Sequence, residues 1–129
     1  EDKFGVTPAA NQVEFHPYNY QKNLLEYCNS KNIIIEAYSP LVHAKRMDEE
    51  RLVAISKEMG KTPAQILIRW AMQRGMVVLP KSVNESRIIE NFAVFDFEIS
   101  DSLMKRLDDL DERYVTCWDP HNPPDYAPV

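Results

Sequence analysis

The chain has 129 residues, which is enough for one domain with a real hydrophobic core. Its 15 lysines and arginines are scattered and are outnumbered by 20 aspartates and glutamates, giving a net charge of −5, so we expect no nucleic-acid-binding surface. The two cysteines and three histidines match no metal-ligand spacing, and no secretory signal or membrane-spanning apolar run is present, which predicts a cytoplasmic protein without a metal site.

Three short apolar segments predict β-strands. They lie at residues 11–15, 33–35 and 76–79. Runs of this kind are typical of strands that are buried on both faces, as in parallel sheets. We therefore expect three parallel strands.

Helical segments lie between and after these strands. Apolar residues recur at helical spacing over residues 21–31, over the stretch that ends at Gly60, and over residues 85–92 and 100–110. The alternation of strands and helices predicts a parallel α/β fold.

The helix that follows Gly60 has the clearest start signal in the chain. Thr62 stands at the N-cap position, Pro63 at the first helical position and Gln65 at the third. This helix carries Trp70 among its apolar residues and is expected to end before Gly75. We expect the indole of Trp70 to pack against the sheet.

Polar and charged residues follow the last predicted strand. Ligands of α/β folds gather at the carboxyl ends of the strands, and the start of a helix offers free N–H groups to an anion. Ser82 and Asn84 can cap the helix that begins near residue 85, while Lys81 and Arg87 can bind a phosphate at its start. This cluster is a candidate phosphate site.

A purely structural interpretation of the same cluster stays open. Ser82 and Asn84 would then only cap the helix, and the two cations beside them would be solvated or would pair with Glu85 and Glu90.

Tyr38 and Ser39 end the preceding predicted strand and would lie on the same rim as the phosphate site. The tyrosine ring could stack on a flat ligand, and the serine hydroxyl could donate to a phosphate. The alternative is a half-buried tyrosine followed by a Ser-Pro turn.

Four motifs of the chain occur together in a recognisable order. They are "NQVEFHPY", "IIIEAYSPL", "KTPAQILIRWAMQRGMVVLPKS" and "RIIENFAVFDFEIS", and over residues 7–118 their order and spacing resemble the aldo-keto reductase superfamily. The family fold is an eight-stranded (β/α)8 barrel of the TIM type, which binds NADPH without a Rossmann glycine fingerprint. The resemblance implies that residues 1–129 form the C-terminal half of such a barrel, with residues 111–129 as an irregular, proline-rich tail.

The resemblance assigns cofactor-binding roles to ten positions. Gln12 would hold the nicotinamide carboxamide, and Tyr38 would stack on the nicotinamide ring. Lys81 and Arg87 would hold the 2′-phosphate, which implies NADPH rather than NADH. The ten residues are Gln12, Tyr38, Ser39 and Leu41 along the nicotinamide and pyrophosphate, and Lys81, Ser82, Val83, Asn84, Arg87 and Asn91 around the adenosine.

The proline-rich tail carries the candidates for substrate contact. By the resemblance, Trp118, His121 and Tyr126 would help to shape a pocket for a small carbonyl substrate. The alternative is a tail that only packs on the rim of the barrel.

The resemblance also implies that the catalytic groups are absent from this sequence. In the family, the catalytic aspartate, tyrosine, lysine and histidine come from strands that precede the first residue here, and none has a counterpart. His16 and Tyr18 belong to a turn of the family scaffold, so we assign no catalytic residue and leave the enzymatic status open. We expect no carbonyl reduction by the chain alone; the alternative function is a non-catalytic half-barrel that binds nucleotides or acts as a structural or interaction protein.

Two further expectations concern surfaces. Residues 42–48 form a short loop in which Val42 stands where many family members have glycine, so a long flap over the cofactor is not expected. Three parallel strands leave two sheet edges and an apolar inner face open. We expect self-association, or pairing with the missing half of the barrel, through these edges.

Overall fold

The computed structural model describes residues 5–117 of the chain. Its elements, in chain order, are β1 (Ala10–Glu14), α1 (Lys22–Ser30), β2 (Ile34–Tyr38), the short 3-10 helix η1 (Val42–Ala44), α2 (Glu50–Met59), α3 (Pro63–Gln73), β3 (Val77–Leu79), α4 (Glu85–Phe92) and α5 (Asp101–Asp108). The strands and helices expected from the sequence are present, and the residue ranges predicted for them lie within three residues of these bounds.

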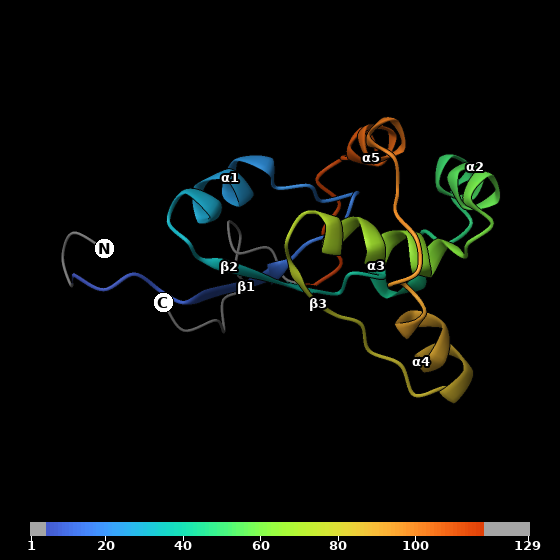
Figure 1. Cartoon of the computed structure of the whole chain (residues 1–129), viewed down its shortest axis with the longest axis horizontal. Helices are drawn as coiled ribbons and strands as arrows, with labels where there is room; N and C mark the ends of the chain where they lie inside the picture. The colour runs from blue at the N-terminus through green and yellow to red at the C-terminus, as the bar shows by residue number, and fades with distance from the viewer. Residues whose placement is uncertain (1–4, 118–129) are drawn as a thin grey trace.

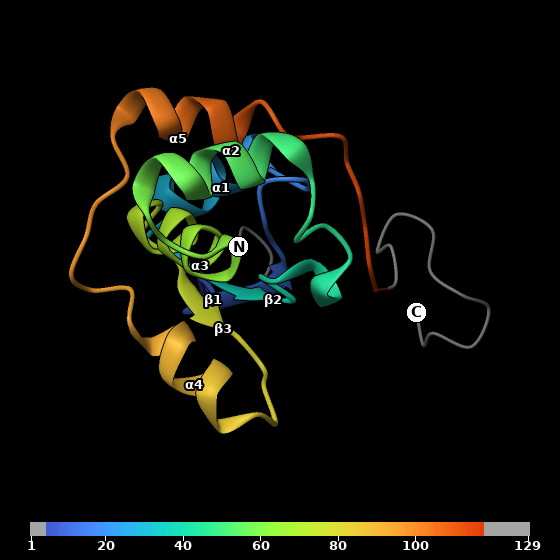
Figure 2. The same cartoon turned by 90° about the vertical axis from the view of Figure 1, so that its right-hand side faces the viewer.

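The three strands form one parallel sheet in the order β1-β2-β3. Glu14, Tyr38 and Leu79 are in register across the sheet, so all three strands end at the same edge. Helices α1, α2, α3 and α5 lie on one side of the sheet, and α4 lies beyond β3 and contacts α3 (Figures 1 and 2). The α/β fold with three parallel strands is confirmed.

The core lies between the sheet and the helices that cover it. Trp70 of α3 is fully buried there. Its ring lies 6.0 Å from that of Phe15, at the end of β1, and 5.3 Å from that of Tyr20. The indole N–H donates to the carboxylate of Asp108 at 2.8 Å, so the one polar atom of this large side chain is satisfied. The predicted packing of Trp70 toward the sheet is confirmed.

The opposite face of the sheet is open. Ile35 and Ala37 are buried under the helices, whereas Ile34, Val77 and Leu79 on the other face are 53%, 46% and 42% exposed. The expectation that these strands are buried on both faces is wrong for the described part of the chain, because the helices of residues 5–117 cover only one face. The expected open inner face is present instead.

Local signals set the ends of α2 and α3 as predicted. Gly60 follows α2 with a left-handed φ of 62°, a conformation that glycine adopts without steric cost. At the start of α3, the N–H of Gln65 donates to Thr62 Oγ1 at 3.3 Å, and the N–H of Thr62 donates to Gln65 Oε1 at 3.0 Å. The capping box is therefore confirmed.

Candidate functional site

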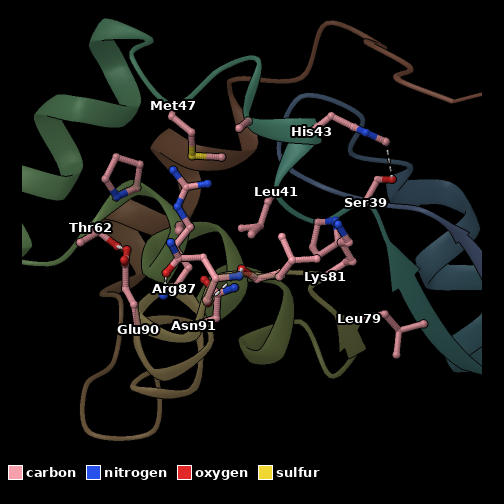
Figure 3. A pocket seen from close by; sticks show the side chains of 17 residues that line it. Ser39, Leu41, His43, Met47, Thr62, Leu79, Lys81, Arg87, Glu90 and Asn91 are labelled. Atoms are coloured by element: carbon pink, nitrogen blue, oxygen red, sulfur yellow. Dashed lines mark hydrogen bonds between the residues drawn. The ribbon is translucent and has the colours of Figure 1, made fainter.

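A cavity of about 700 Å³ opens beyond the carboxyl ends of β2 and β3. Its walls come from η1, from the start of α3, and from α4 together with the loop that leads into it (Figure 3). Eight of the ten residues predicted to bind the cofactor line this cavity: Ser39, Leu41, Lys81, Ser82, Val83, Asn84, Arg87 and Asn91. Residues that lie more than fifty positions apart in the sequence thus share one site.

Gln12 and Tyr38, the other two predicted residues, lie outside the lining of this cavity. The side-chain amide of Gln12 donates to the carboxylate of Glu36 at 2.8 Å, on the open face of the sheet. Tyr38 is half-buried at the end of β2 and is followed directly by Ser39. The structure therefore brings together the predicted phosphate-binding residues but does not place Gln12 and Tyr38 among them.

Lys81 and Arg87 are the positive charges of the cavity. Both side chains are exposed, and neither forms an ion pair within residues 5–117. The alternative in which they pair with Glu85 and Glu90 is not realised; Glu90 accepts a hydrogen bond from the hydroxyl of Thr62 instead. Two cations remain available to an anion, which a phosphate can bridge with charge-assisted hydrogen bonds.

The capping part of the structural interpretation is confirmed. The side chain of Asn84 accepts the N–H of Arg87 at 3.3 Å, and Ser82 Oγ accepts the N–H of Asn84 at 3.1 Å. The first turn of α4 is thereby fixed with Arg87 facing the cavity. Capping and anion binding are compatible here, because the caps use side-chain oxygens and leave the cations free.

The rim of the cavity opposite α4 has an unusual backbone. Val42, His43 and Ala44, which form η1, have φ values of 53°, 50° and 60°, and Ser39 has 49°. Left-handed φ is uncommon for residues with a Cβ atom and is a clear outlier for a β-branched valine. Ser39 Oγ and His43 Nε2 lie 3.0 Å apart and both line the cavity (Figure 3). The loop is a tight turn, and it holds these two polar side chains at the rim.

Glu14 is the most perturbed acid near this rim. Burial alone would raise its pKa, but hydrogen bonds from His16, Thr116 and Cys117 outweigh burial and lower the pKa to about 2. Burial raises the pKa of the Tyr38 hydroxyl, and the neighbouring Cys117 and Glu14 raise it further. The carboxylate of Glu14 is therefore ionised at all ordinary pH values.

His16 and Tyr18 belong to the turn that follows β1. They are 1% and 0% exposed, and neither lines the cavity. His16 Nε2 lies 3.0 Å from Glu14 Oε1, and burial, above all, raises the pKa of Tyr18. Neither side chain is open to a substrate.

Trp118, His121 and Tyr126 lie outside the described residues, so their substrate role stays a prediction.

Within residues 5–117, no group of three or more His, Cys, Asp or Glu side chains is arranged to hold a metal ion. None of the helices described has the length and apolar character needed to span a bilayer.

The cavity also contains residues that the sequence did not single out for binding. Thr62 and Glu90 stand on the side of the cavity opposite Ser39 and His43 (Figure 3). A signal for Glu90 was present, because it lies three positions after Arg87 and therefore on the same face of a helix. Thr62 was recognised only as a cap, since nothing local shows that the start of α3 meets α4.

Comparisons with known proteins agree with this geometry. The model of the Aldo/keto reductase family matches residues 1–112. An uncharacterized oxidoreductase of Schizosaccharomyces pombe is 47% identical over 115 residues, covering 89% of this chain and 42% of that protein. Glyoxal reductase of Bacillus subtilis is 46% identical over 110 residues, covering 84% of this chain and 40% of that protein.

Solved structures show the same relationship. The apo form of Gox0644 superposes with a TM-score of 0.90 at 35% identity, covering 97% of this chain and 46% of that one. A mutant of Gox0644 in complex with NADPH superposes with a TM-score of 0.82 at 38% identity, covering 87% and 41%. The chain spans about two fifths of the length of the curated relatives it matches. Because the family model matches most of its residues, the chain belongs to the aldo/keto reductase family.

Proposed function

We propose that this chain is the NADPH-binding, C-terminal part of an aldo-keto reductase, acting in the cytoplasm on a small carbonyl compound once the remaining part of the barrel is supplied. The observation that carries the proposal is the cavity in which Lys81 and Arg87 stand without ion-pair partners among residues 5–117, beside six other predicted cofactor residues. The NADPH complex of a relative 38% identical supports the choice of cofactor.

The residues of the cavity fit the parts of NADPH in chemical terms. Arg87 offers a planar fork of donors and Lys81 a compact positive charge, and together they suit a phosphate monoester such as the 2′-phosphate. The hydroxyl of Ser39 can donate to the pyrophosphate from the opposite rim. NADPH, when bound, supplies a hydride for the carbonyl carbon.

We propose that Gln12 and Tyr38 bind the cofactor outside the cavity. Gln12 and Tyr38 stand on the open face of the sheet, near the carboxyl ends of β1 and β2. The amide of Gln12 would hold the nicotinamide carboxamide, and the ring of Tyr38 would support the nicotinamide plane. Proton donation to the carbonyl oxygen requires groups from outside this chain, so the chain by itself binds the cofactor without turning over a carbonyl.

A calorimetric titration tests the cofactor proposal. The 129-residue chain is titrated with NADPH and with NADH, alongside Arg87→Ala and, as a control, Arg106→Ala, which removes a cation of α5 that pairs with Glu58. We expect saturable binding that prefers NADPH, with Arg87→Ala weakening NADPH about tenfold or more because it removes charge-assisted hydrogen bonds. Arg106→Ala should leave both affinities unchanged.

Two results would contradict the proposal. Equal affinity for NADPH and NADH, unaffected by Arg87→Ala, would show that the cations do not bind the 2′-phosphate. Failure of both nucleotides to bind would leave the chain as a structural or interaction protein.

Exposed apolar residues favour a second role for the chain, which is to bind another protein chain. Ile34, Val77 and Leu79 lie on the open sheet face, and α4 adds Ile89 and Phe92, which are 64% and 73% exposed. Surfaces of this kind mark interaction sites. We propose that they pair with the complementary part of a barrel or, without it, with a second copy of the chain. Sedimentation at micromolar concentration should then show a dimer or larger species, and a clean monomer would refute self-association.

A further inference from the structure

Glu14 is buried on a face of the sheet that is otherwise open. It is in register with Tyr38 and Leu79, so the three side chains lie on the same face. Leu79 is 42% exposed, whereas Glu14 is only 4% exposed. Because helices do not cover this face, another part of the chain must cover Glu14.

The covering segment is the stretch at residues 116–117. Thr116 donates its backbone N–H, at 2.8 Å, and its hydroxyl to Glu14 Oε1, while Cys117 donates its N–H to Glu14 Oε2 at 3.1 Å. Hydrogen bonds to an ionised carboxylate are about twice as strong as neutral ones. Both oxygens of Glu14 are thus used to hold a segment that lies more than a hundred positions away in the sequence.

Glu14 is itself held rigidly. Its backbone carbonyl accepts hydrogen bonds from the side-chain amides of Asn19 at 3.2 Å and Gln21 at 3.0 Å. At its carboxylate, Oε1 lies 3.0 Å from Nε2 of the buried His16. A carboxylate fixed at both ends can define the position of whatever it binds.

The segment that Glu14 holds ends beside the cavity. Cys117 Sγ lies 3.4 Å from Ser39 Oγ and 3.4 Å from His43 Nε2. Ser39 and His43 both line the cavity, on the rim where the backbone turns left-handed. The contacts therefore run from Glu14 through residues 116–117 to the mouth of the cavity.

We propose that Glu14 is a positioning residue that docks the stretch at residues 116–117 onto the carboxyl ends of β1 and β2. In doing so it fixes Ser39 and His43 at the mouth of the cavity. Glu14 does not line the cavity and acts through Thr116 and Cys117. Its effect on nucleotide affinity rests on the function proposed above, whereas the docking itself does not.

Amide hydrogen exchange together with calorimetry tests this proposal. The variants are Glu14→Gln, Thr116→Val, the double variant, and the control Glu26→Gln, which makes the same chemical change at an exposed position of α1. In Glu14→Gln we expect the amides of Thr116 and Cys117 to exchange about tenfold faster or more, because one carboxylate that accepts from both is lost. Amides of the core helix α3 should keep their rates, and Glu26→Gln should change neither segment.

The nucleotide readout separates positioning from general stability. We expect Glu14→Gln to weaken NADPH binding several-fold, Thr116→Val to weaken it less, and the double variant to be no worse than Glu14→Gln. Additive effects of the two substitutions would contradict a route through Thr116. Unchanged exchange at residues 116–117 in Glu14→Gln would overturn the docking.

Two remaining outcomes are also decisive. If Glu14→Gln does not fold, Glu14→Asp, which withdraws the carboxylate by one methylene, carries the test, and normal exchange at both Thr116 and Cys117 in that variant would refute the proposal. If the unmodified chain binds no NADPH while exchange at residues 116–117 still responds to Glu14→Gln, the docking stands and the nucleotide-binding function falls.

Discussion

Replacing Glu14 by glutamine is expected to change how the stability of the protein responds to acid. The pKa of Glu14 falls from its ordinary value of 4.5 to about 2 in the folded chain. A difference of this size corresponds to about 3 kcal/mol of the free energy of unfolding. The carboxylate is 4% exposed, so solvent screening reduces this figure little.

The sign follows from which state takes up the proton first. The unfolded chain binds a proton at Glu14 once the pH falls below about 4.5, while the folded chain resists protonation until about pH 2. The stabilisation is therefore present in full above pH 4.5 and is lost as the pH falls from 4.5 to about 2. A glutamine, which does not titrate, lacks this loss.

Urea denaturation across this pH range measures the effect. We expect the difference in unfolding free energy between the native chain and Glu14→Gln to shrink by about 3 kcal/mol between neutral pH and about pH 2. Other carboxylates contribute equally to both proteins, so the difference isolates Glu14. A difference that stays constant over the whole range would refute the hydrogen-bonded, ionised Glu14 described above.

Two further substitutions test local backbone and capping geometry by the same urea denaturation at neutral pH. Ala44→Gly should raise the free energy of unfolding by up to about 1 kcal/mol, because φ at this exposed position is 60°. Glycine adopts this φ without the steric cost that alanine has. A loss of stability would contradict the left-handed turn. Thr62→Ala should lower the free energy of unfolding by about 1 kcal/mol, because it removes the hydroxyl that accepts the N–H of Gln65 in the capping box. Thr62→Ser keeps the hydroxyl and should retain most of this stability.

Features encoded by a few neighbouring residues could be predicted from the sequence. The capping box at Thr62 and the left-handed Gly60 depend on contacts within one turn of helix, and the structure reproduces both. The cluster around Lys81 and Arg87 was visible because a strand, a loop and a helix start follow one another directly. Its closeness to Ser39 was also predictable, because Ser39 follows the preceding parallel strand and the carboxyl ends of parallel strands share one edge of the sheet.

Features that depend on distant segments could not be predicted. Nothing near Glu14 in the sequence shows that Thr116 and Cys117 bind it, because the partners meet only after the whole chain has folded. The exposure of Ile34 and Val77 was misjudged for a similar reason. Their apolar character suits a fully covered strand, but no helix among residues 5–117 lies over that face.

The order of the strands bears on how the protein can be made. Each strand pairs with the one before it in the sequence, β2 with β1 and β3 with β2, at separations of 24 residues between Ala10 and Ile34 and 41 between Glu36 and Val77. The sheet therefore grows at one edge in the order in which a ribosome releases the chain, and no strand has to be inserted between two others. Residues 116–117 follow all three strands in the sequence, so their contacts with Glu14 can form only after β1, β2 and β3 have been synthesised.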